Sequence, residues 1–486
     1  MMVDAIGGRA LSHEAAKRPD LRRLAREGTV HFVGIAGAGM SALAEALVRT
    51  GGRVSGCDTH AADAVEIGDA LRARGVSIEQ GHDASHVDNA VAVVVTSAVP
   101  ADHPELMAAR ARGLPVFKRA EALGSFVERG RVLAVAGTHG KTTTSAMLAA
   151  ILAEAGLDPT AFVGGRVPGW GGGLRAGSEN LFVVEADEYD RSFLTLKPRV
   201  ALVTTVEADH LDIYGNVEAV EHAFETFVDA VPADGLVIAC VDDEGARRVL
   251  ASHDGRTLGY GLGADAQLRG VPLESRGRTT RLAIWERGRE LGRLTLTVPG
   301  MHNVRNALGA FVAAREVGAD LAEAQRALAE FRGVGRRFQE IGRPRGVTVV
   351  DDYAHHPTEV RATIEAARST FPGHRVVAVF QPHLYSRTRD FAGAFGAALA
   401  AADAVWVTDI YPAREAPIPG ITGEMVAQAA ESAGARHVEY EADRGALAGR
   451  LAIVVRSGDV CVFMGAGDID RAARALVEML GRGEAP

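Results

Sequence analysis

The middle of the chain carries an apolar segment, a glycine-rich turn and a long apolar helix in direct succession. Residues 132–136 read VLAVA, residues 137–142 read GTHGKT, and residues 141–155 read as a helix that ends at Gly156. The first run is typical of a buried parallel strand, and the last has helical length and a glycine stop. Glycines let backbone N–H groups approach phosphates, and a helix N-terminus favours anions. This succession predicts an α/β domain that binds nucleotide phosphates.

The side chains of the turn indicate which nucleotide and which metal. Lys141 can neutralise β- and γ-phosphates and Thr142 can ligate Mg²⁺, so we expect ATP with Mg²⁺. The turn departs from the pattern G-x-x-x-x-G-K-[ST], because Val135 stands at its first position and the leading glycine comes two residues later. Lysine is rare in this chain, which favours a phosphate site over a glycine turn that carries a lysine by chance. The lysines are Lys17, Lys118, Lys141 and Lys197.

Two further apolar segments end in acidic residues. The run at 182–184 is followed by EADE, which begins at Glu185, and the run at 200–206 is followed by EADH, which ends at His210. The carboxyl ends of parallel strands border the nucleotide crevice in α/β folds. We therefore expect Glu185 to ligate Mg²⁺, directly or through water, and His210 to be a candidate for a second metal position. The alternatives are a solvated acidic turn and a structural histidine.

A second glycine turn lies near the N-terminus. Gly34, Gly37 and Gly39 follow a short apolar strand, and a helix comes next. Asp58 lies 19 residues after the last of these glycines. The arrangement is similar to a dinucleotide-binding turn, although Ala36 replaces the glycine that lets the backbone approach a pyrophosphate. We expect a diphosphate to bind here. Because UDP-sugars and NAD both present that group, an NAD-dependent oxidoreductase stays open as an alternative.

Length, charge and cysteine content set outer limits on the function. The 486 residues correspond to about three domains of roughly 150 residues. A net charge of −9 gives no indication of nucleic acid or an anionic membrane as a partner. No apolar run is long enough to span a bilayer, and the N-terminus lacks a signal-peptide pattern, so we expect a cytoplasmic enzyme. Cys57, Cys240 and Cys461 have no metal-binding or redox spacing and are interpreted as ordinary thiols.

Strands that alternate with helices predict α/β blocks along the chain. We place an N-terminal extension and three blocks at 1–28, 29–127, 128–336 and 337–486. Strands are expected at 31–35, 54–58, 91–96, 132–136, 181–185, 200–206, 347–351, 375–380, 404–408 and 460–464. The alternating stretch 279–298 predicts a hairpin in a small antiparallel sheet. Residues 342–346, GRPRG, are typical of a linker ahead of the strands of the third block.

Eleven segments, in order from His31 to about Ile469, resemble the Mur ligases of peptidoglycan synthesis, and most closely the MurC type of that family. The segments are HFVGIAGAGMSALAE (31–45), TSAVPADHPE (96–105), AGTHGKTTTSAMLA (136–149), EADEYDRSFL (185–194), EADHLDIYG (207–215), GMHNVRNALGA (300–310), FRGVGRRFQ (331–339), DDYAHHPTEV (351–360), QPHLYSRTRDF (381–391), DIYPAREAPIPGI (409–421) and MGAGDI (464–469). The resemblance implies a Rossmann-like UDP-binding domain, a central P-loop ATPase-like domain with a small antiparallel sheet, and a C-terminal Rossmann-like α/β domain.

The resemblance also implies roles for individual residues. Those implied to bind ATP are Gly137, Thr138, His139, Gly140, Lys141, Thr142, Thr143, Asn303, Asn306, Arg337 and Asp351. Of these, the asparagines would contact adenine, Arg337 the phosphates and Asp351 the ribose. Those implied to ligate magnesium are Thr142, Glu185 and His210. Those implied to bind the substrates are Gly34, Gly37, Gly39, Asp58, Ser97, Tyr353, His355 and Arg387. The catalytic set implied is Lys141, Arg337, His355 and Arg387.

Several of these residues have simpler structural explanations. Asn303 can cap a helix, because HN before an apolar run is a helix-start signal. Arg337 can form an ion pair between domains, and His355 and His356 can shape the turn before Pro357.

The chain departs from the family pattern at two positions, and it lacks a lysine that some of its relatives use at the metal site. Leu384 stands where the family usually has arginine, and Tyr189 replaces a common serine. The relatives that add later residues use a carbamoylated lysine after the ADH segment, but no lysine follows Lys197. This favours the MurC type.

The implied activity is ATP-dependent ligation of L-alanine to the lactyl carboxylate of UDP-N-acetylmuramate through an acyl phosphate, the first peptide step of peptidoglycan precursor synthesis. The expected partners are those substrates, without nucleic acid or membrane, in a monomer or homodimer. The alternatives are a ligase that recycles a whole tripeptide onto the same sugar nucleotide, the NAD-dependent oxidoreductase, and a non-enzymatic ATP-binding regulator.

Overall fold

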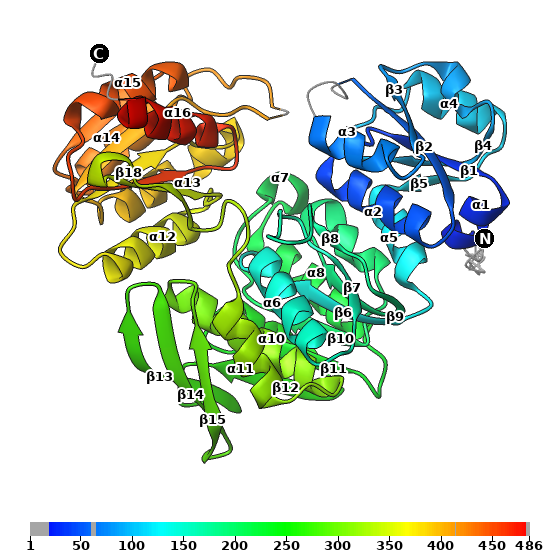
Figure 1. Ribbon diagram of the computed structural model, residues 1–486, viewed down its shortest axis with the longest axis horizontal. Helices are drawn as coiled ribbons and strands as arrows, with labels where there is room; N and C mark the ends of the chain where they lie inside the picture. Colours follow the sequence, from blue (N-terminus) through cyan, green and yellow to red (C-terminus); the bar gives the residue numbers. More distant parts are fainter. Residues whose placement is uncertain (1–18, 60–64, 414, 483–486) are drawn as a thin grey trace, which may run out of the picture. The chain divides into compact units, whose positions relative to one another are not determined.

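The computed structural model describes residues 19–59, 65–413 and 415–482, so most of the predicted extension 1–28 lies outside the described residues. The chain divides into two compact units, Met1–Arg129 and Gly130–Pro486, which we describe separately (Figure 1). No helix among the described residues has the length and apolar content that crossing a membrane requires.

The first unit is a parallel sheet with helices on both faces. Its described strands run in the order β3-β2-β1-β4-β5, and all neighbours are parallel. They are β1 (Thr29–Val33), β2 (Arg53–Asp58), β3 (Ser77–Gln80), β4 (Ala90–Val95) and β5 (Val116–Lys118). The helices are α1 (Leu21–Glu27), α2 (Ala38–Arg49), α3 (Val65–Arg72), η1 (Ala84–Val87), α4 (Pro104–Ala111) and α5 (Arg119–Val127). The strand order reverses between β1 and β4, and ligands of such sheets bind outside the carboxyl ends of the strands at this point.

The described end of the predicted extension belongs to this unit. Asp20 caps α1 by accepting a hydrogen bond from Arg23 N. Leu21 and Ala25 of α1 are fully buried, and the Arg22 guanidinium lies 4.3 Å from the centre of the Phe126 ring. Residues 21–27 are therefore a packed helix of the first unit.

The second unit begins with a ten-stranded sheet in the described residues, in the order β15-β14-β13-β12-β11-β10-β6-β9-β7-β8. The strands are β6 (Arg131–Ala136), β7 (Pro159–Phe162), β8 (Leu174–Arg175), β9 (Ser178–Glu185), β10 (Val200–Val203), β11 (Leu236–Cys240), β12 (Thr257–Gly261), β13 (Leu268–Arg276), β14 (Thr279–Glu286) and β15 (Arg289–Leu296). The helices are α6 (Lys141–Glu154), η2 (Tyr189–Thr195), α7 (Leu211–Tyr214), α8 (Val217–Asp229), α9 (Glu244–Ser252), α10 (Met301–Glu316) and α11 (Leu321–Glu330). Helix α6 is apolar on most sides because it packs between the sheet and helices α10 and α11.

The predicted hairpin at 279–298 is present as β14 and β15, but it is not a separate sheet. Strand β13 pairs antiparallel with β14 and parallel with β12, so the three antiparallel strands extend the central sheet at one edge. Figure 1 shows them side by side in green.

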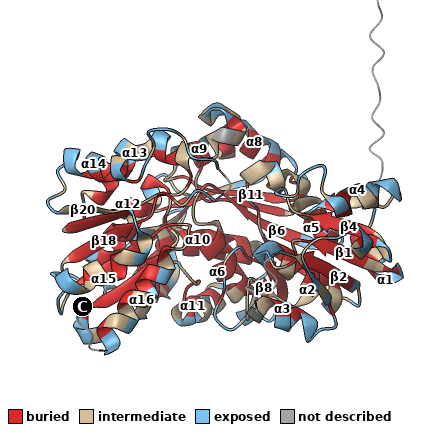
Figure 2. Ribbon diagram, turned by 90° about the horizontal axis from the view of Figure 1, so that it is seen from above, coloured by how far each residue is buried: buried red, intermediate tan, exposed pale blue. Residues whose placement is uncertain are grey.

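The second unit continues with a six-stranded sheet in the described residues, in the order β16-β17-β21-β18-β19-β20. The strands are β16 (Gln339–Gly342), β17 (Thr348–Asp352), β18 (Val376–Phe380), β19 (Ala404–Thr408), β20 (Val438–Glu441) and β21 (Val460–Met464). The helices are η3 (Pro344–Gly346), α12 (Pro357–Thr370), α13 (Tyr385–Leu399), α14 (Glu424–Ser432), α15 (Arg444–Val454) and α16 (Ile469–Arg482). The central strands are buried on both faces, under separate apolar clusters (Figure 2).

The prediction of a linker at 342–346 is wrong. Gly342 ends β16, which pairs antiparallel with β17, and residues 344–346 form a short 3-10 turn between these strands. The segment therefore lies inside the last sheet. The α/β fold class itself is confirmed by all three sheets.

Candidate active site

The GTHGKT turn joins β6 to α6, as predicted. Gly137 has φ +133°, and a Cβ there would lie 2.0 Å from Thr204 Oγ1. Gly140 precedes the helix with φ +84°, and a Cβ there would lie 2.6 Å from Asn306 Oδ1. Thr138 N also donates a hydrogen bond to the carbonyl of Thr205, which follows β10. Glycine is thus required at both positions for backbone conformation and for space.

Lys141 is held by the turn and by one acid. Its ammonium donates hydrogen bonds to the carbonyls of Gly137 at 2.6 Å and Thr138 at 3.2 Å, and it lies 2.7 Å from Glu188 Oε2. Burial opposes the charged form, but Glu188 and Asp187 hold the pKa of Lys141 above its ordinary value. The cation is therefore fixed at the start of α6 with its charge retained.

Two of the predicted metal ligands touch each other. Thr142 Oγ1 donates a hydrogen bond of 2.7 Å to Glu185 Oε1, at the carboxyl end of β9. His210 lies nearby, with Nε2 3.9 Å from Glu188 Oε1, and its Nδ1 is buried without a hydrogen-bond partner in the described residues. Burial lowers the pKa of His210, so its ring is neutral and has a free lone pair. All three side chains line one cavity.

Two cavities flank the turn. The first, of about 310 Å³, is lined by His139, Gly140, Thr143 and the predicted adenine contacts Asn303 and Asn306. Asn306 Nδ2 donates to Asn303 Oδ1, and Asn303 Nδ2 donates to the carbonyl of Pro299. Helix α10 begins after Gly300, so Asn303 does not act as its N-cap.

The second cavity, of about 970 Å³, contains the predicted acceptor residues Tyr353, His355 and Arg387. His355 Nδ1 lies 2.8 Å from the carbonyl of Tyr353, and burial lowers the pKa of His355 to about 4. Arg387 donates a hydrogen bond to Asp209, and both side chains are almost fully buried. These residues lie on the same side of the turn as Thr142 and Glu185.

A charged cluster stands where the two cavities meet. Residues His139, Gly140, Arg337 and Glu359 line both cavities. Arg337 Nη1 lies 3.8 Å from Glu359 Oε1, and His139 Nδ1 lies 3.2 Å from the same oxygen. Burial alone would lower the pKa of His139, but Glu359 and Glu207 raise it to about 10. His139 is therefore an imidazolium on the phosphate turn.

Asp351 does not reach either cavity. It is fully buried, its Oδ2 lies 3.3 Å from Arg336 Nε, and burial raises its pKa. The next residue, Asp352, lines the first cavity and accepts hydrogen bonds from Phe338 N and Ala354 N. Successive side chains of a strand point to opposite faces, so only one of the two acids can face the nucleotide side of β17.

In the first unit, three predicted substrate contacts lie at the carboxyl ends of neighbouring strands. Gly34 follows β1 with φ +80°, Asp58 ends β2, and Ser97 lies in the turn after β4. Asp58 Oδ2 accepts a hydrogen bond of 3.0 Å from Ala36 N, inside the glycine turn. Gly37 precedes α2 and Gly39 lies in its first turn. The glycine turn thus borders the point where the strand order reverses.

Three Mur ligase domain families match consecutive parts of the chain. They are the Mur ligase family catalytic domain over residues 29–131, the Mur ligase middle domain over 135–314 and the Mur ligase glutamate ligase domain over 336–467. The chain belongs to the Mur ligase family.

Individual members of the family resemble this Mur ligase over nearly its whole length. A UDP-N-acetylmuramate–L-alanine ligase of Salinibacter ruber is 44% identical over 96% of this chain and 97% of its own. One of an Arthrobacter species is 48% identical over 87% of this chain and 90% of its own. The crystal structure of the UDP-N-acetylmuramate-alanine ligase MurC from Thermotoga maritima superimposes with a TM-score of 0.78 at 31% identity, covering 94% of this chain and 100% of its own.

Sequence reasoning missed three acids that position the site of this Mur ligase, and it missed the ion pair that a fourth, Glu188, forms with Lys141. Glu188 pairs with Lys141, Asp209 with Arg387, and Glu359 with His139 and Arg337, while Asp352 lines the first cavity. Each acid stands inside a quoted family segment. Its partner lies elsewhere in the sequence, so no local spacing indicates the pair.

The two departures from the family pattern both lie in the second cavity of this Mur ligase. Leu384 precedes α13 with φ +69°, an uncommon conformation for leucine, and its side chain is buried. The Tyr189 ring packs against the His210 ring, with 5.2 Å between their centres.

Proposed function

We propose that the chain uses ATP to join L-alanine to the lactyl carboxylate of UDP-N-acetylmuramate. One observation carries this proposal: the turn with Lys141 lies between a cavity of nucleoside size and a larger cavity that contains both cations and acids. The names of the similar ligases supply the substrates. As parts of the same proposal, we keep the domain boundaries 128–336 and 337–486, the monomer or homodimer, and the cytoplasmic location. For the first domain we keep the predicted end at residue 127, but we begin it at α1 and not at residue 29.

In this proposal the adenosine of ATP occupies the first cavity, and its phosphates cross the turn into the second. Asn303 and Asn306 face the adenine. Asp352 takes the ribose contact that the resemblance assigns to Asp351, because it is the one that lines the cavity. The first amides of a helix have no partner within it, so those of α6 are available to phosphate oxygens. Lys141 exchanges the Glu188 carboxylate for the β- and γ-phosphates.

The donor set near Lys141 fits Mg²⁺. Thr142 Oγ1 and Glu185 Oε1 are 2.7 Å apart, and both are hard oxygen donors of the kind that Mg²⁺ prefers. The buried Nδ1 of His210 has no hydrogen-bond partner in the described residues, which suits a second metal position. When bound, Mg²⁺ would neutralise part of the charge on the transferring phosphoryl group.

The proposed reaction has two steps. The lactyl carboxylate oxygen attacks the γ-phosphorus and ADP leaves, which gives an acyl phosphate. The alanine nitrogen then attacks the acyl carbon, loses a proton, and inorganic phosphate leaves from the tetrahedral intermediate. Lys141 and Arg337 stabilise the phosphoryl charge, and Arg387 and Tyr353 position the carboxylate.

His355 is our candidate for the group that accepts the proton of the alanine nitrogen. Its Nδ1 is directed to the Tyr353 carbonyl, so Nε2 can carry the accepting lone pair. The glycine turn of the first unit, with Asp58 and Ser97, holds the UDP portion in this proposal.

The test is release of phosphate from ATP and Mg²⁺ with UDP-N-acetylmuramate and a panel of acceptors. The panel contains L-alanine, glycine, L-serine and the tripeptide L-alanyl-γ-D-glutamyl-meso-diaminopimelate. We expect release that requires all three substrates and is fastest with L-alanine. Release with the tripeptide alone would identify a recycling ligase instead. ATP binding without turnover in every mixture would identify a regulator, and binding of NADH in place of ATP would identify an oxidoreductase.

A further inference from the structure

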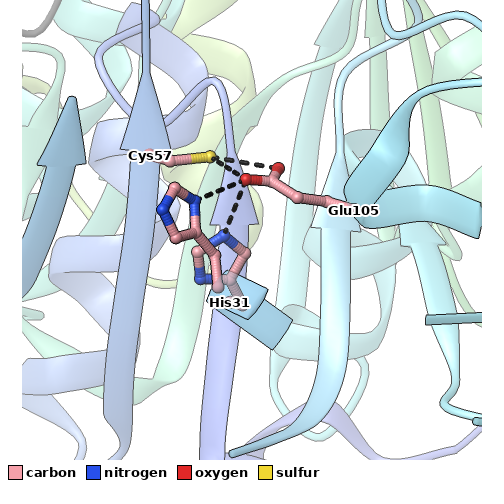
Figure 3. Close-up of side chains that lie close together, drawn as sticks. His31, Cys57 and Glu105 are labelled. Atoms are coloured by element: carbon pink, nitrogen blue, oxygen red, sulfur yellow. Dashed lines mark hydrogen bonds and ion pairs between the residues drawn. The ribbon is translucent and has the colours of Figure 1, made fainter. Parts of the chain in front are cut away.

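Four side chains with metal-ligating atoms meet inside the first unit. His31 comes from β1, Cys57 from β2, His86 from η1 and Glu105 from the first turn of α4. Figure 3 shows Cys57 and His31 directed toward the Glu105 carboxylate. Cys57 Sγ lies 3.0 Å and His86 Nδ1 lies 2.7 Å from Glu105 Oε1, while His31 Nε2 lies 3.9 Å from it. All four donor atoms lie within 4.8 Å of one another.

The cluster is enclosed and contains an unsatisfied atom. The side chains of His31 and Glu105 are 1% and 0% exposed, and Cys57 is fully buried. His31 Nδ1 lies 3.0 Å from Ser55 Oγ, whereas His31 Nε2, which faces the carboxylate, has no hydrogen-bond partner in the described residues. Buried polar atoms without a partner are rare and call for an explanation such as an ion. A metal ion at the centre of the cluster would satisfy this nitrogen.

The donor types and spacing suit one tetrahedral zinc ion. Zinc bonds of roughly 2.0–2.3 Å to nitrogen, oxygen and sulfur place neighbouring ligand atoms about 3.3–3.8 Å apart. The observed separations from Glu105 Oε1 lie on both sides of that range, so small side-chain rotations suffice. A thiolate, a carboxylate and two neutral imidazoles also cancel the charge of Zn²⁺, which a buried site requires.

Metal binding would form the metal–sulfur bond while the proton of the Cys57 thiol is released to solvent.

Residues next to the cluster form hydrogen bonds that orient its metal-ligating side chains. The hydrogen bond to Ser55 orients the His31 ring with Nε2 inward, in the way that outer partners orient zinc-bound histidines. His82 Nδ1 lies 3.2 Å from Cys57 Sγ and can donate to the thiolate. His82 and His86 are 24% and 17% exposed, so the ion can enter from their side.

We propose that His31, Cys57, His86 and Glu105 bind one structural Zn²⁺ ion in the first unit. Four protein ligands leave no open coordination position, as in structural rather than catalytic zinc sites. The ion would cross-link four elements: the strands β1 and β2, the 3-10 helix η1 and the helix α4. It would also stiffen the glycine turn, because the carbonyl of Cys57 accepts hydrogen bonds from Gly34 N and Ile35 N. The proposal is independent of the ligase reaction.

The test uses Co²⁺, which replaces Zn²⁺ and gives a near-ultraviolet absorption band when a thiolate binds it. The full-length protein is freed of metal with a chelator and titrated with Co²⁺ in the absence of ATP and Mg²⁺. We expect one Co²⁺ per chain, a thiolate band, and loss of the band when one equivalent of Zn²⁺ is added. Cys57→Ser should lose the band. Cys240→Ser, which removes another buried thiol in the second unit, should keep it.

The partly exposed ligand His86 provides a second test in case Cys57→Ser does not fold. His86→Asn should keep the far-ultraviolet circular dichroism of the parent and weaken Co²⁺ binding at least about tenfold. The exposed His222 provides the matched control, since His222→Asn should bind Co²⁺ like the parent. The proposal is overturned if the parent shows no thiolate band, if the band persists in Cys57→Ser, or if His86→Asn binds Co²⁺ as tightly as the parent.

Discussion

Lys141 Nζ lies 2.7 Å from Glu188 Oε2, so the cation at the head of the phosphate turn is paired with a buried carboxylate. The two residues come from the start of α6 and the loop after β9. A phosphate that binds to the turn competes with Glu188 for Lys141. Lys141 should therefore favour nucleotide binding and Glu188 should oppose it, and the first two predictions test these two effects.

Lys141→Ala should lower phosphate release in the complete reaction at least about 100-fold, because it removes a charge that stabilises the transferring phosphoryl group. The measurement is the initial rate with ATP, UDP-N-acetylmuramate and L-alanine. Lys197→Ala is the matched control, since Lys197 is an exposed lysine of the same unit and should retain the parent rate. Near-normal release by Lys141→Ala would contradict our assignment of the turn.

Glu188→Gln should bind ATP several-fold more tightly than the parent when Mg²⁺ is absent. The substitution keeps the shape of the side chain but removes the charge that competes with the phosphates for Lys141. Calorimetric titration in the presence of a chelator measures the affinity. Weaker binding by Glu188→Gln would mean that the carboxylate supports the bound nucleotide and does not compete with it.

Gly140→Ala should destabilise the second unit more than Gly156→Ala does. Both glycines have positive φ and lie at the two ends of α6, so alanine costs about 1–2 kcal/mol of backbone strain at each. Only at Gly140 would the new Cβ also meet a side chain, 2.6 Å from Asn306 Oδ1, whereas nothing lies within 4 Å at Gly156. Thermal unfolding should show the larger drop for Gly140→Ala. Equal drops would show that Asn306 moves aside without cost.

The phosphate turn was predictable because its signals are local. The run at 132–136, the glycines and the helix from Lys141 stand next to one another in the sequence, and the structure keeps their order. It is harder to predict on which face of a sheet the side chain of a strand residue lies. The sequence Asp351-Asp352 offers two acids, and a one-residue difference in register exchanges their faces. Only the packing of β17 under Arg336 decides that Asp352 lines the nucleotide cavity.

Strand β13 was missed because its sequence contains two strand-breaking residues, Gly270 and Pro272. Proline cannot donate a hydrogen bond to a neighbouring strand, and it therefore argues against a central strand. The structure accommodates it because β12 pairs with β13 only at Leu268 and Arg269, which leaves one edge open at the proline. The cluster around Cys57 was missed for a different reason: its ligands come from four separate segments and show no ligand spacing in the sequence.

The Asp209–Arg387 pair should contribute strongly to stability and make it sensitive to acid. Both side chains are almost fully buried, so Arg387→Met should cost about 3–5 kcal/mol by leaving a buried charge without its partner. The double variant Arg387→Met with Asp209→Asn should recover much of this loss. Denaturant unfolding of the single and double variants measures the coupling, and additive losses would contradict a direct pair.

The same pair predicts a pH dependence at the acidic end. Burial opposes ionisation of Asp209, but Arg387 and the nearby histidines hold its pKa well below its ordinary value of 3.8. A depressed pKa gives stability that is present above pH 3.8 and is lost as the pH falls below it. The free energy of unfolding of the parent should therefore fall below pH 3.8 more steeply than that of Asp209→Asn. Parallel curves would show that other carboxylates cause the acid sensitivity.

His139 predicts a second pH dependence, at the alkaline end. Glu359 and Glu207 overcome the effect of burial and raise the pKa of His139 to about 10, from an ordinary value of 6.5. A raised pKa gives stability that is fully present below pH 6.5 and is lost as the pH rises through 10, by at most about 1.4 kcal/mol per pH unit. His139→Gln cannot gain this charge, so its free energy of unfolding should change less than that of the parent between pH 6.5 and 10. His222→Gln, which changes an exposed histidine beside Glu225, should follow the parent curve. A His139→Gln curve as steep as the parent's would show that the imidazolium between the two carboxylates is not the source of the alkaline loss.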